Sequence, residues 1–575
     1  MSAVRRIVSN KLFSKWDYTA TFRRCVATGN TNNIIKSASS DISVPNVTLS
    51  EFIYEKAEKF NKYTAFVSGT TGRSYTFEQI RVKSTNFSKV LREKFKLKDG
   101  DVIAMFLPNV PEYVICFLGS LEARLVVTTM NPMYTVDEIA KQILDASPKL
   151  IVTQANLVST ARSALELTKR QLPLIIVKET QAESLPEGTI DLSELINTHL
   201  DVPDLQPGNP DDVAIMPYSS GTTGLPKGVL LTHKNLTSNL TQMSHPDFST
   251  LQAPTNEYQD MSPAVLPFYH IYGLMLNFLF ICHGTRCVAL DKFTPESYIA
   301  ALKNNPISII FAAPPLVLFL TAHPDVKSEY FNSLKTLSCG AAPLGSLDEE
   351  RFLQKVGRDV NIIQGYGLTE TSPVVSFTPK NIVRSEKNIG SVGRLVSNTI
   401  AKIINPDDPE GTPLGPNEKG EILLKGPQVM KGYFNRPEET KNTFLGGWLR
   451  TGDIGYYNED NMLYITDRLK ELIKVRGFQV APAELEEIIR DHPSVAEAAV
   501  IGIPHPLSGE VPRAYIVPKK DKTVDIEELD QYVSKKVAKY KKISGGIQIV
   551  DVIPKNPSGK ILRRKLKENY LEKEI

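Results

Sequence analysis

Residues 102–106, Val-Ile-Ala-Met-Phe, form a short apolar run, and the segment at 111–123 that follows it has the spacing of a helix. The same alternation of apolar runs and helical segments continues at 125–128, 136–146, 150–153, 157–169 and 174–177. Strands that alternate with helices favour right-handed crossovers and a parallel sheet covered on both faces. We therefore expect an α/β fold, with a large N-terminal domain built of doubly wound subdomains.

Later parts of the chain predict further units. The alternation resumes with strand candidates at 286–290, 307–312, 336–339 and 361–363 and with helices at 294–304 and 345–356. From about residue 395, short strand candidates at 421–424 and 462–465 are separated by Pro and Gly turns, which indicates a β-rich subdomain. The end of the chain combines helices and strands at 483–491, 496–503, 513–517 and 526–540. We predict an N-terminal domain at 41–468 and a small α+β C-terminal domain at 469–575.

Composition narrows the function classes. The chain has 575 residues, 41% hydrophobic and 23% charged, so it can bury several cores. A net charge of +3 is small for this length and gives no reason to expect nucleic acid as a partner. The five cysteines lack disulfide spacing, and Cys282, His283 and Cys287 lack a second ligand pair for zinc. The longest apolar runs, 274–282 and 307–321, are too short and interrupted for a transmembrane segment.

Residues 1–40 have a composition of their own. They contain seven Lys or Arg residues and a single acid, Asp17, and several apolar residues could share one helical face. This composition is typical of a mitochondrial presequence, and the alternative is a basic leader without a targeting role in a cytoplasmic protein. The sequence ends in Glu-Lys-Glu-Ile, which is not the Ser-Lys-Leu signal of peroxisomal proteins.

Residues 218–228, Tyr-Ser-Ser-Gly-Thr-Thr-Gly-Leu-Pro-Lys-Gly, have the composition of a phosphate-binding loop. The glycines let backbone amides approach an anion, the hydroxyls add donors, and Lys227 adds a positive charge. Apolar residues on both sides indicate a turn between two strands. A flexible surface loop is the alternative. The Walker A pattern does not fit, because Leu225-Pro226 intervenes and Gly228 follows Lys227.

Four later segments add groups that suit a nucleotide. They are Gln364-Gly365-Tyr366-Gly367-Leu368-Thr369-Glu370, Thr451-Gly452-Asp453, the basic stretch at 467–474, and Pro557-Ser558-Gly559-Lys560. Each is weak alone, since most charged residues are surface ion-pair partners. In this order, after the glycine-rich loop, they closely resemble the motifs of the adenylate-forming enzymes, which include acyl-CoA synthetases and 4-coumarate-CoA ligases. The resemblance runs from about residue 45 to 570.

The resemblance implies a role for each matching residue. ATP would be bound by Ser219, Ser220, Gly221, Thr222, Thr223, Gly224 and Lys227 at the phosphates, by Gly340, Ala341, Ala342, Gln364, Gly365 and Tyr366 around the adenine, and by Asp453 and Arg468 at the ribose. Thr369 and Glu370 would bind phosphate and Mg²⁺. Lys560 would bridge the carboxylate substrate and the α-phosphate, where a desolvated cation stabilises developing charge.

The resemblance also implies a mobile C-terminal domain and a coenzyme A site. Lys470 matches the hinge position of the family. The residues Lys474, Arg476, Gly477 and Gln479 match the segment that replaces Lys560 in the active site when coenzyme A arrives. Lys292 matches a contact to a coenzyme A phosphate. Arg476 departs from the Lys that is usual in 4-coumarate-CoA ligases, but it keeps the positive charge.

The segment Pro267-Phe268-Tyr269-His270-Ile271-Tyr272 resembles the acid-pocket motif of the 4-coumarate-CoA ligases. The resemblance places His270 beside the carboxylate and lines the pocket with Tyr272, Gly340, Gly365, Pro373 and Val374. A histidine among aromatic residues is also common in a protein core. No acidic residue occurs between Ala264 and Asn277, which disfavours an α-amino acid substrate.

These features predict an ATP- and Mg²⁺-dependent ligase that joins a carboxylic acid to coenzyme A through an acyl-AMP intermediate. The acid is expected to be an aryl acid, such as 4-coumarate, or a medium- or long-chain fatty acid. The alternatives are a luciferase-like oxidase that uses the same adenylate, and a catalytically silent nucleotide-binding scaffold. A serine hydrolase is disfavoured because no Gly-x-Ser-x-Gly motif occurs.

Overall fold

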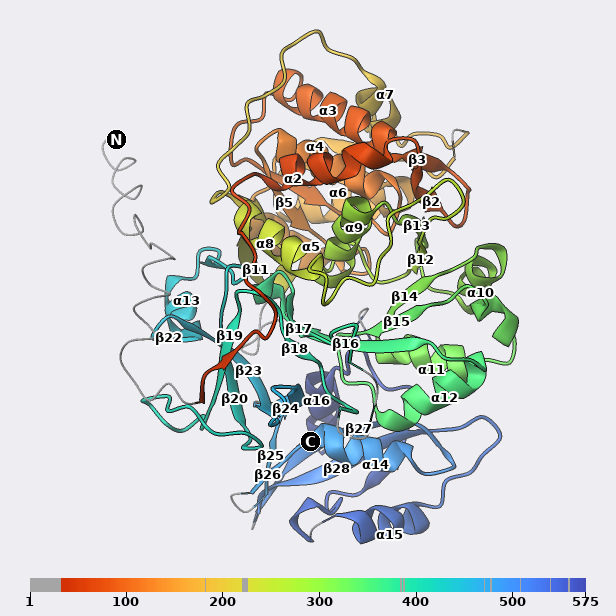
Figure 1. Ribbon diagram of the computed structural model, residues 1–575, viewed down its shortest axis with the longest axis vertical. Coiled ribbons are helices and arrows are strands. Elements are labelled where there is room, and N and C mark those ends of the chain that lie inside the picture. The colour runs from red at the N-terminus through yellow and green to blue at the C-terminus, as the bar shows by residue number, and fades with distance from the viewer. Residues whose placement is uncertain are drawn as a thin grey trace.

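The computed structural model describes residues 33–180, 182–219, 226–382, 385, 388–469, 471–475, 478–506, 508–537, 539–556 and 559–574. Most of the predicted leader lies outside these residues. The expected α/β architecture is confirmed: four sheets form a large N-terminal body, and the fifth belongs to a smaller unit at the C-terminal end of the chain, drawn in blue in Figure 1.

The largest sheet follows the alternation that begins at residue 102. Its strand order is β10-β11-β9-β5-β4-β6-β7-β8, with β21 paired to β11. The strands are β4 Val102–Met105, β5 Val126–Thr129, β6 Leu150–Gln154, β7 Leu174–Val177, β8 Ile190–Asp191, β9 Val213–Ile215, β10 Tyr218–Ser219, β11 Lys227–Thr232 and β21 Gly432–Tyr433. Strands β4 to β8 pair in parallel, which was predicted for β4 to β7. The turn expected within 218–228 is confirmed by the antiparallel β10–β11 pair.

Helices cover both faces of this sheet (Figure 1). They are α2 Leu49–Ala57, α3 Phe77–Glu93, α4 Glu112–Glu122, α5 Val136–Ala146, α6 Val158–Leu167, α7 Leu192–Asn197 and α8 His233–Met243. Ten of the eleven residues of α4 are buried, because this helix lies between the sheet and the outer helices α2 and α3. The Thr135 side chain caps α5 by accepting a hydrogen bond from the backbone of Glu138. The Glu138 side chain in turn accepts a hydrogen bond from the Thr135 backbone.

Two further sheets are formed mainly by strands from the middle of the chain. One has the order β12-β13-β2-β3 and the other β14-β15-β16-β17-β18. Their strands are β2 Thr64–Ser68, β3 Ser74–Thr76, β12 Met261–Ala264, β13 Arg286–Ala289, β14 Ile309–Ala312, β15 Thr336–Cys339, β16 Asn361–Gly367, β17 Val374–Phe377 and β18 Arg394–Leu395. The neighbouring helices are α9 Ile271–His283, α10 Pro295–Asn304, α11 Pro314–Ala322 and α12 Ser346–Val356.

One prediction in this region is wrong. Residues 364–367 were expected to follow a strand that ends at residue 363, but they belong to β16. The strand continues because Gly365 and Tyr366 pair with Phe377 and Ser376 of β17 in antiparallel register. A Cβ at Gly365 would lie 2.7 Å from the Phe377 ring, so glycine here permits close packing within the sheet.

The β-rich subdomain expected after residue 395 is confirmed. Its sheet has the order β1-β19-β20-β23-β22, with β24 paired to β23. The strands are β1 Ile35–Lys36, β19 Ile400–Ile404, β20 Gly420–Lys425, β22 Phe444–Leu445, β23 Trp448–Tyr457 and β24 Leu463–Arg468, and helix α13, Pro437–Thr443, lies beside them. Strand β1 comes from the start of the described chain and pairs with the first two residues of β19, so residues 35–36 are part of the folded body.

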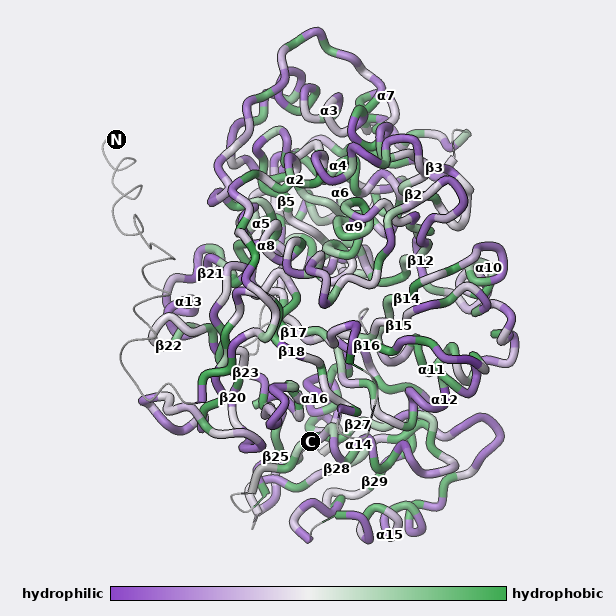
Figure 2. The backbone as a smooth tube through the Cα atoms, in the orientation of Figure 1, coloured by the Kyte–Doolittle hydropathy of each residue, from purple (hydrophilic) through white to green (hydrophobic). Residues whose placement is uncertain are grey.

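The C-terminal unit has its own sheet, β26-β25-β28-β27 with β29, and its own hydrophobic core. Its elements are β25 Ile473–Val475, β26 Phe478–Val480, α14 Pro482–Arg490, β27 Val495–His505, β28 Gly509–Pro518, α15 Ile526–Lys536, β29 Ile547–Ile549 and α16 Arg563–Glu574. Figure 2 shows hydrophobic residues concentrated along the strands and hydrophilic residues along α15 and the outer loops. Helix α15 ends earlier than the predicted residue 540, since Val537 has an extended backbone.

Candidate active site

A cleft of about 1370 Å³ lies between the N-terminal body and the C-terminal unit. Predicted residues from both parts line it, namely Ser219, His270, Tyr272, Gly340, Ala341, Gly365, Tyr366, Thr369, Glu370, Pro373, Val374, Arg468 and Lys560. These residues span more than half of the sequence, and the fold brings them together at the ends of β10, β15, β16 and β24. The cleft is therefore the candidate active site.

The first strand of the glycine-rich hairpin, β10, lines the cleft. Ser219 pairs with Lys227, and Tyr218 with Gly228, across β10 and β11. A Cβ at Gly228 would lie 2.9 Å from the Met216 side chain, so this glycine permits close packing at the base of the hairpin. Ser220, Gly221, Thr222, Thr223 and Gly224 lie outside the described residues.

Glu370 connects the hairpin to β21, which pairs with the second strand of the hairpin. Its Oε1 accepts hydrogen bonds of 3.0 Å from Ser219 Oγ and 3.0 Å from the Tyr433 hydroxyl. The Tyr433 ring also lies 5.1 Å from Lys227 Nζ, and Lys227 forms an ion pair with Glu439 of α13. Tyr433 was not among the predicted site residues. Its position follows from the pairing of β21 with β11, which brings it to the hairpin.

Glu370 fits the role of a Mg²⁺ ligand. Its carboxylate lies in the cleft beside the hairpin, and Mg²⁺ is commonly held in proteins by one or two carboxylates together with substrate phosphates. The described residues contain no cluster of three or more acidic, His or Cys side chains that would hold a metal ion without a substrate.

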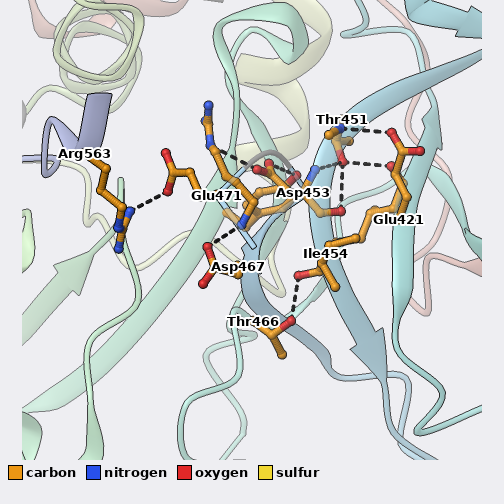
Figure 3. Close-up of polar contacts among 12 residues, drawn as sticks. Glu421, Thr451, Asp453, Ile454, Thr466, Asp467, Glu471 and Arg563 are labelled. Atoms are coloured by element: carbon orange, nitrogen blue, oxygen red, sulfur yellow. Dashed lines mark hydrogen bonds and ion pairs between the residues drawn. The ribbon is translucent and has the colours of Figure 1, made fainter. Parts of the chain in front are cut away.

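Asp453 of β23 joins two other predicted nucleotide residues. It accepts a 2.7 Å hydrogen bond from the Tyr366 hydroxyl, and its Oδ1 lies 3.2 Å from Arg468 Nε. Asp453 is 4% exposed, and burial raises the pKa of its carboxyl while Arg468 opposes that shift. Figure 3 shows Asp453 beside Thr451 and Glu421, where Thr451 Oγ1 accepts a hydrogen bond from the Asp453 backbone. This network fixes the Asp453 carboxylate behind Tyr366 and Arg468, which line the cleft, although Asp453 itself is not one of the lining residues.

Lys560 lies in the cleft although it belongs to the C-terminal unit. It follows Gly559, whose φ of 83° lies in the left-handed region that favours glycine. Burial lowers the pKa of Lys560 to about 8, and the positive charge of Arg468 contributes to the shift. Three residues further on, Arg563 pairs with Glu486 and with Glu471 (Figure 3), which anchors the start of α16 next to the chain segment that links the two units.

His270 and Tyr272 form an aromatic wall of the cleft at the start of α9. His270 caps this helix, and its Nδ1 accepts a 3.3 Å hydrogen bond from the Tyr272 backbone. Burial lowers the pKa of His270 to about 4, so its imidazole is neutral at pH 7. A Cβ at Gly340 would lie 3.3 Å from the Tyr272 hydroxyl, so the absence of a side chain at Gly340 leaves room beside the ring.

Several predicted residues are not brought into the cleft. Gln364 is buried and binds the backbone of Leu344 and the side chain of Glu349, so it supports the loop after β15. Ala342, Lys292 and Lys474 do not line the cleft, and Lys474 is exposed on β25. Lys470, Arg476 and Gly477 lie outside the described residues, as does the side chain of Gln479.

The fold and the cleft together define the class of the adenylate-forming enzymes. Residues 53–434 match the family described as AMP-binding enzyme, and residues 484–560 match the AMP-binding enzyme C-terminal domain. The chain belongs to this family of AMP-binding enzymes.

Named relatives and solved structures agree with this assignment. The chain is 38% identical over 547 residues to 4-coumarate-CoA ligase 2 of Narcissus pseudonarcissus, covering 93% of this chain and 94% of that protein. It is 37% identical to 4-coumarate-CoA ligase 1 of Solanum tuberosum, covering 93% and 96%. The ATP-bound MatB of Rhodopseudomonas palustris has a TM-score of 0.80 at 26% identity, covering 92% and 99%. The o-succinylbenzoate CoA synthetase of Bacillus subtilis, in complex with its acyl-adenylate intermediate, has a TM-score of 0.73 at 27% identity, covering 90% and 97%.

No helix among the residues that the structure describes has the length and apolar character needed to span a membrane. Among the residues that the structure describes, Cys116, Cys282, Cys287 and Cys339 are free and buried.

Proposed function

We propose that this protein is an ATP-dependent ligase that joins a carboxylic acid to coenzyme A through an acyl-AMP intermediate. The observation that carries the proposal is the position of Lys560. Lys560 has a lowered pKa and lines the cleft. One end of the glycine-rich hairpin and an aromatic, largely uncharged wall line the same cleft. Such a cation suits a reaction in which one anion attacks another.

In the first step the substrate carboxylate attacks the α-phosphate of ATP, and pyrophosphate leaves. We propose that Lys560 stabilises the negative charge that develops between the two anions. Tyr366 would bind the adenine, and Asp453 with Arg468 would bind the ribose. The hairpin, with Lys227 and Thr369, would hold the departing phosphates. Mg²⁺ at Glu370 would neutralise phosphate charge. Neutral His270 would lie beside the acid without adding a charge of its own.

In the second step the coenzyme A thiol displaces AMP and forms the thioester. Lys474 is exposed while Lys560 is in the cleft, which supports the assignment of this arrangement to the first step. We propose that the unit at 469–575 turns about Lys470 and brings Lys474, Arg476, Gly477 and Gln479 to the cleft. Lys292 would then bind a coenzyme A phosphate. Positioning and exclusion of water are the main demands on this step.

The acid is proposed to be an aryl acid or a medium- or long-chain fatty acid. Tyr272, Gly340, Gly365, Pro373 and Val374 offer no charge for an ammonium group, and a pocket of this kind favours a neutral acyl part. The relatives named 4-coumarate-CoA ligase support the aryl alternative.

The test is acid-dependent exchange of labelled pyrophosphate into ATP, followed by detection of CoA esters by mass spectrometry. We expect exchange with at least one member of a panel of aryl acids and of fatty acids from hexanoic to octadecanoic. A panel without any exchange would overturn the proposal. Exchange without a CoA ester would instead indicate another fate of the adenylate, such as oxidation, which oxygen consumption would reveal.

We also propose that residues 1–40 direct the protein to mitochondria. Their excess of basic over acidic residues supports this. A fluorescent protein carrying residues 1–40 should enter mitochondria, and replacing Arg5 and Arg6 by Glu should prevent entry. A diffuse signal from the unchanged fusion would refute the assignment.

A further inference from the structure

Lys227 is paired with a carboxylate that lies outside the cleft. The Lys227 side chain is 11% exposed, and its Nζ forms an ion pair with Glu439 of α13. The same Nζ lies 5.1 Å from the centre of the Tyr433 ring. Pro226, which precedes Lys227, and Tyr433 line the cleft, whereas Lys227 and Glu439 do not. The ammonium group of Lys227 is therefore held next to the cleft by an anion of the chain itself.

Glu439 has a second cation beside it. Lys227 contacts Glu439 Oε2, and Arg436 Nε lies 3.6 Å from Glu439 Oε1. Arg436 Nη2 also lies 3.5 Å from Asp145 Oδ1 at the end of α5, so this arginine is held from another side as well. One carboxylate is thus shared by two cations. If Lys227 moved away, Arg436 would remain as a partner of Glu439.

The cleft wall next to Lys227 contains groups proposed to bind phosphate and Mg²⁺. Glu370, Ser219 and Tyr433 line the cleft here, and the last two donate hydrogen bonds to Glu370. A triphosphate bound at this wall carries several negative charges and attracts Lys227, whose flexible side chain lets its Nζ turn. The Glu439 carboxylate and the phosphate then compete for one ammonium group.

We propose that Glu439 competes with phosphate for Lys227, which weakens the binding of ATP and speeds the release of pyrophosphate. In the ligand-free protein the carboxylate stabilises a largely buried cation that would otherwise lose its partner. After the α-phosphate has been attacked, Glu439 offers Lys227 a partner other than pyrophosphate. Glu439 is thus a positioning residue that acts through Lys227. This inference rests on the phosphate site of the proposed function.

The test compares Glu439→Gln with the unchanged protein in the binding of two ligands. They are pyrophosphate with Mg²⁺ and α,β-methylene-ATP, whose α–β bridge cannot be cleaved, and titration calorimetry at low ionic strength measures both. We expect both Kd values to be about 3- to 5-fold lower in Glu439→Gln, the effect of a partly exposed ion pair. Damage to the site would weaken binding, so tighter binding separates competition from a merely structural role.

Glu438→Gln is the matched control. Glu438 lies in the same first turn of α13, is exposed, and forms no ion pair among the residues that the structure describes. This variant removes the same charge from the same helix, but the removed group does not contact Lys227. Both Kd values should equal those of the unchanged protein.

Arg436→Gln tests the exchange of partners in the opposite direction. Without Arg436, the Glu439 carboxylate has Lys227 as its main partner, so phosphate must displace a stronger contact. Both Kd values should therefore rise. In the double variant with Glu439→Gln, the same Arg436→Gln change should raise them by a smaller factor, because no carboxylate remains to compete.

The inference and the proposed function fail in different ways. Kd values that stay the same or rise in Glu439→Gln would overturn the inference and show that Glu439 holds Lys227 in its binding position. Equal tightening in Glu438→Gln would overturn it too, since general charge would then explain the effect. Both results leave the ligase function in place. Binding of both ligands without exchange for any acid would overturn the ligase function and leave the competition for Lys227 standing.

Discussion

At the scale of single residues, the proposed role of Lys560 should make adenylation depend on pH. Its ammonium group is the form that stabilises developing negative charge, and burial lowers its pKa to about 8. We therefore expect kcat/KM of the adenylation step to be constant below about pH 7 and to fall roughly 10-fold per pH unit well above pH 8. Pyrophosphate exchange across this range measures it.

Variants of Lys560 separate its charge from other causes of the pH effect. Lys560→Arg keeps a cation that does not titrate in this range, so the fall should disappear at whatever rate remains. A fall that persists in Lys560→Arg would assign the titration to another group. Lys560→Ala should lower adenylation by at least about 10²-fold while thioester formation from added acyl-AMP stays largely intact. Equal loss of both steps would contradict the assignment of this lysine to the first step.

Tyr366 is expected to act on ATP through Asp453 as well as through its ring. Its hydroxyl donates to a carboxylate that is 4% exposed, and a hydrogen bond to a charged group contributes about 1.5–3 kcal/mol. Tyr366→Phe keeps the ring but leaves Asp453 with Arg468 as its main partner. We expect the KM for ATP to rise about 10-fold or more with little change in the KM for the acid.

The matched control is Tyr54→Phe, since the Tyr54 hydroxyl donates to Glu122 between α2 and α4, away from the cleft. This variant should lower stability and leave both KM values unchanged. Equal changes in the two variants would show that Tyr366→Phe acts through stability alone.

At the scale of elements, Asp467 links the end of β24 to the start of α14. Its carboxylate accepts hydrogen bonds from the backbone of Arg468 and of Ala483. Burial raises the pKa of Asp467 to about 6, although Arg563 opposes the shift. Because the folded pKa lies above the unfolded value, this group stabilises the fold below about pH 4, and that contribution is lost as the pH rises through 6.

Asp467→Asn remains neutral at every pH and keeps one acceptor oxygen, but its amide nitrogen cannot accept the second backbone hydrogen bond. The lost bond should lower stability by about the same amount at every pH, whereas the stability of the variant relative to the unchanged protein should rise by up to about 3 kcal/mol between pH 4 and pH 7. Urea unfolding of both proteins across this range measures the difference. A difference that does not change with pH would show that the carboxyl titrates normally in the folded state.

Elements were predictable from the sequence where the pattern is local. The parallel strands β4 to β7 appear as short buried runs between helical segments, and the hairpin at 218–228 is marked by its glycines and flanking apolar residues. The extension of β16 through residues 364–367 was not predictable, because it depends on pairing with β17 ten residues later. Glycines that suggest a loop in a sequence can also permit close packing inside a sheet.

At the scale of the whole molecule, the site was predictable only in part. The motifs indicated Tyr366, Asp453, Arg468 and Lys560. The structure brings Tyr366, Arg468 and Lys560 to one cleft, with Asp453 bound to Tyr366 and Arg468. Tyr433 was missed because its position depends on the pairing of β21 with β11, about 200 residues earlier in the chain. Gln364 was expected at the nucleotide but is engaged within the fold, where its amide holds the loop after β15.

The two parts of the molecule are joined by an ion pair that the sequence could not indicate. Arg490 of α14 lies 3.1 Å from Asp348 of α12, whose side chain is 8% exposed. We expect this pair to favour the arrangement of the C-terminal unit that places Lys560 in the cleft. Removing it should favour other arrangements of that unit, and a partly buried pair of this kind contributes about 1 kcal/mol, or about a 5-fold change in population.

We expect Arg490→Gln to lower the rate of adenylation by about 5-fold and to leave thioester formation from added acyl-AMP unchanged or faster. Lys536→Gln is the matched control, because Lys536 pairs with Asp491 within the C-terminal unit and both side chains are exposed. It should change neither step. The exchanged pair Asp348→Arg with Arg490→Asp should restore adenylation if the contact acts through charge. Equal slowing of both steps in Arg490→Gln would show instead that the ion pair serves stability and does not select one arrangement of the two parts.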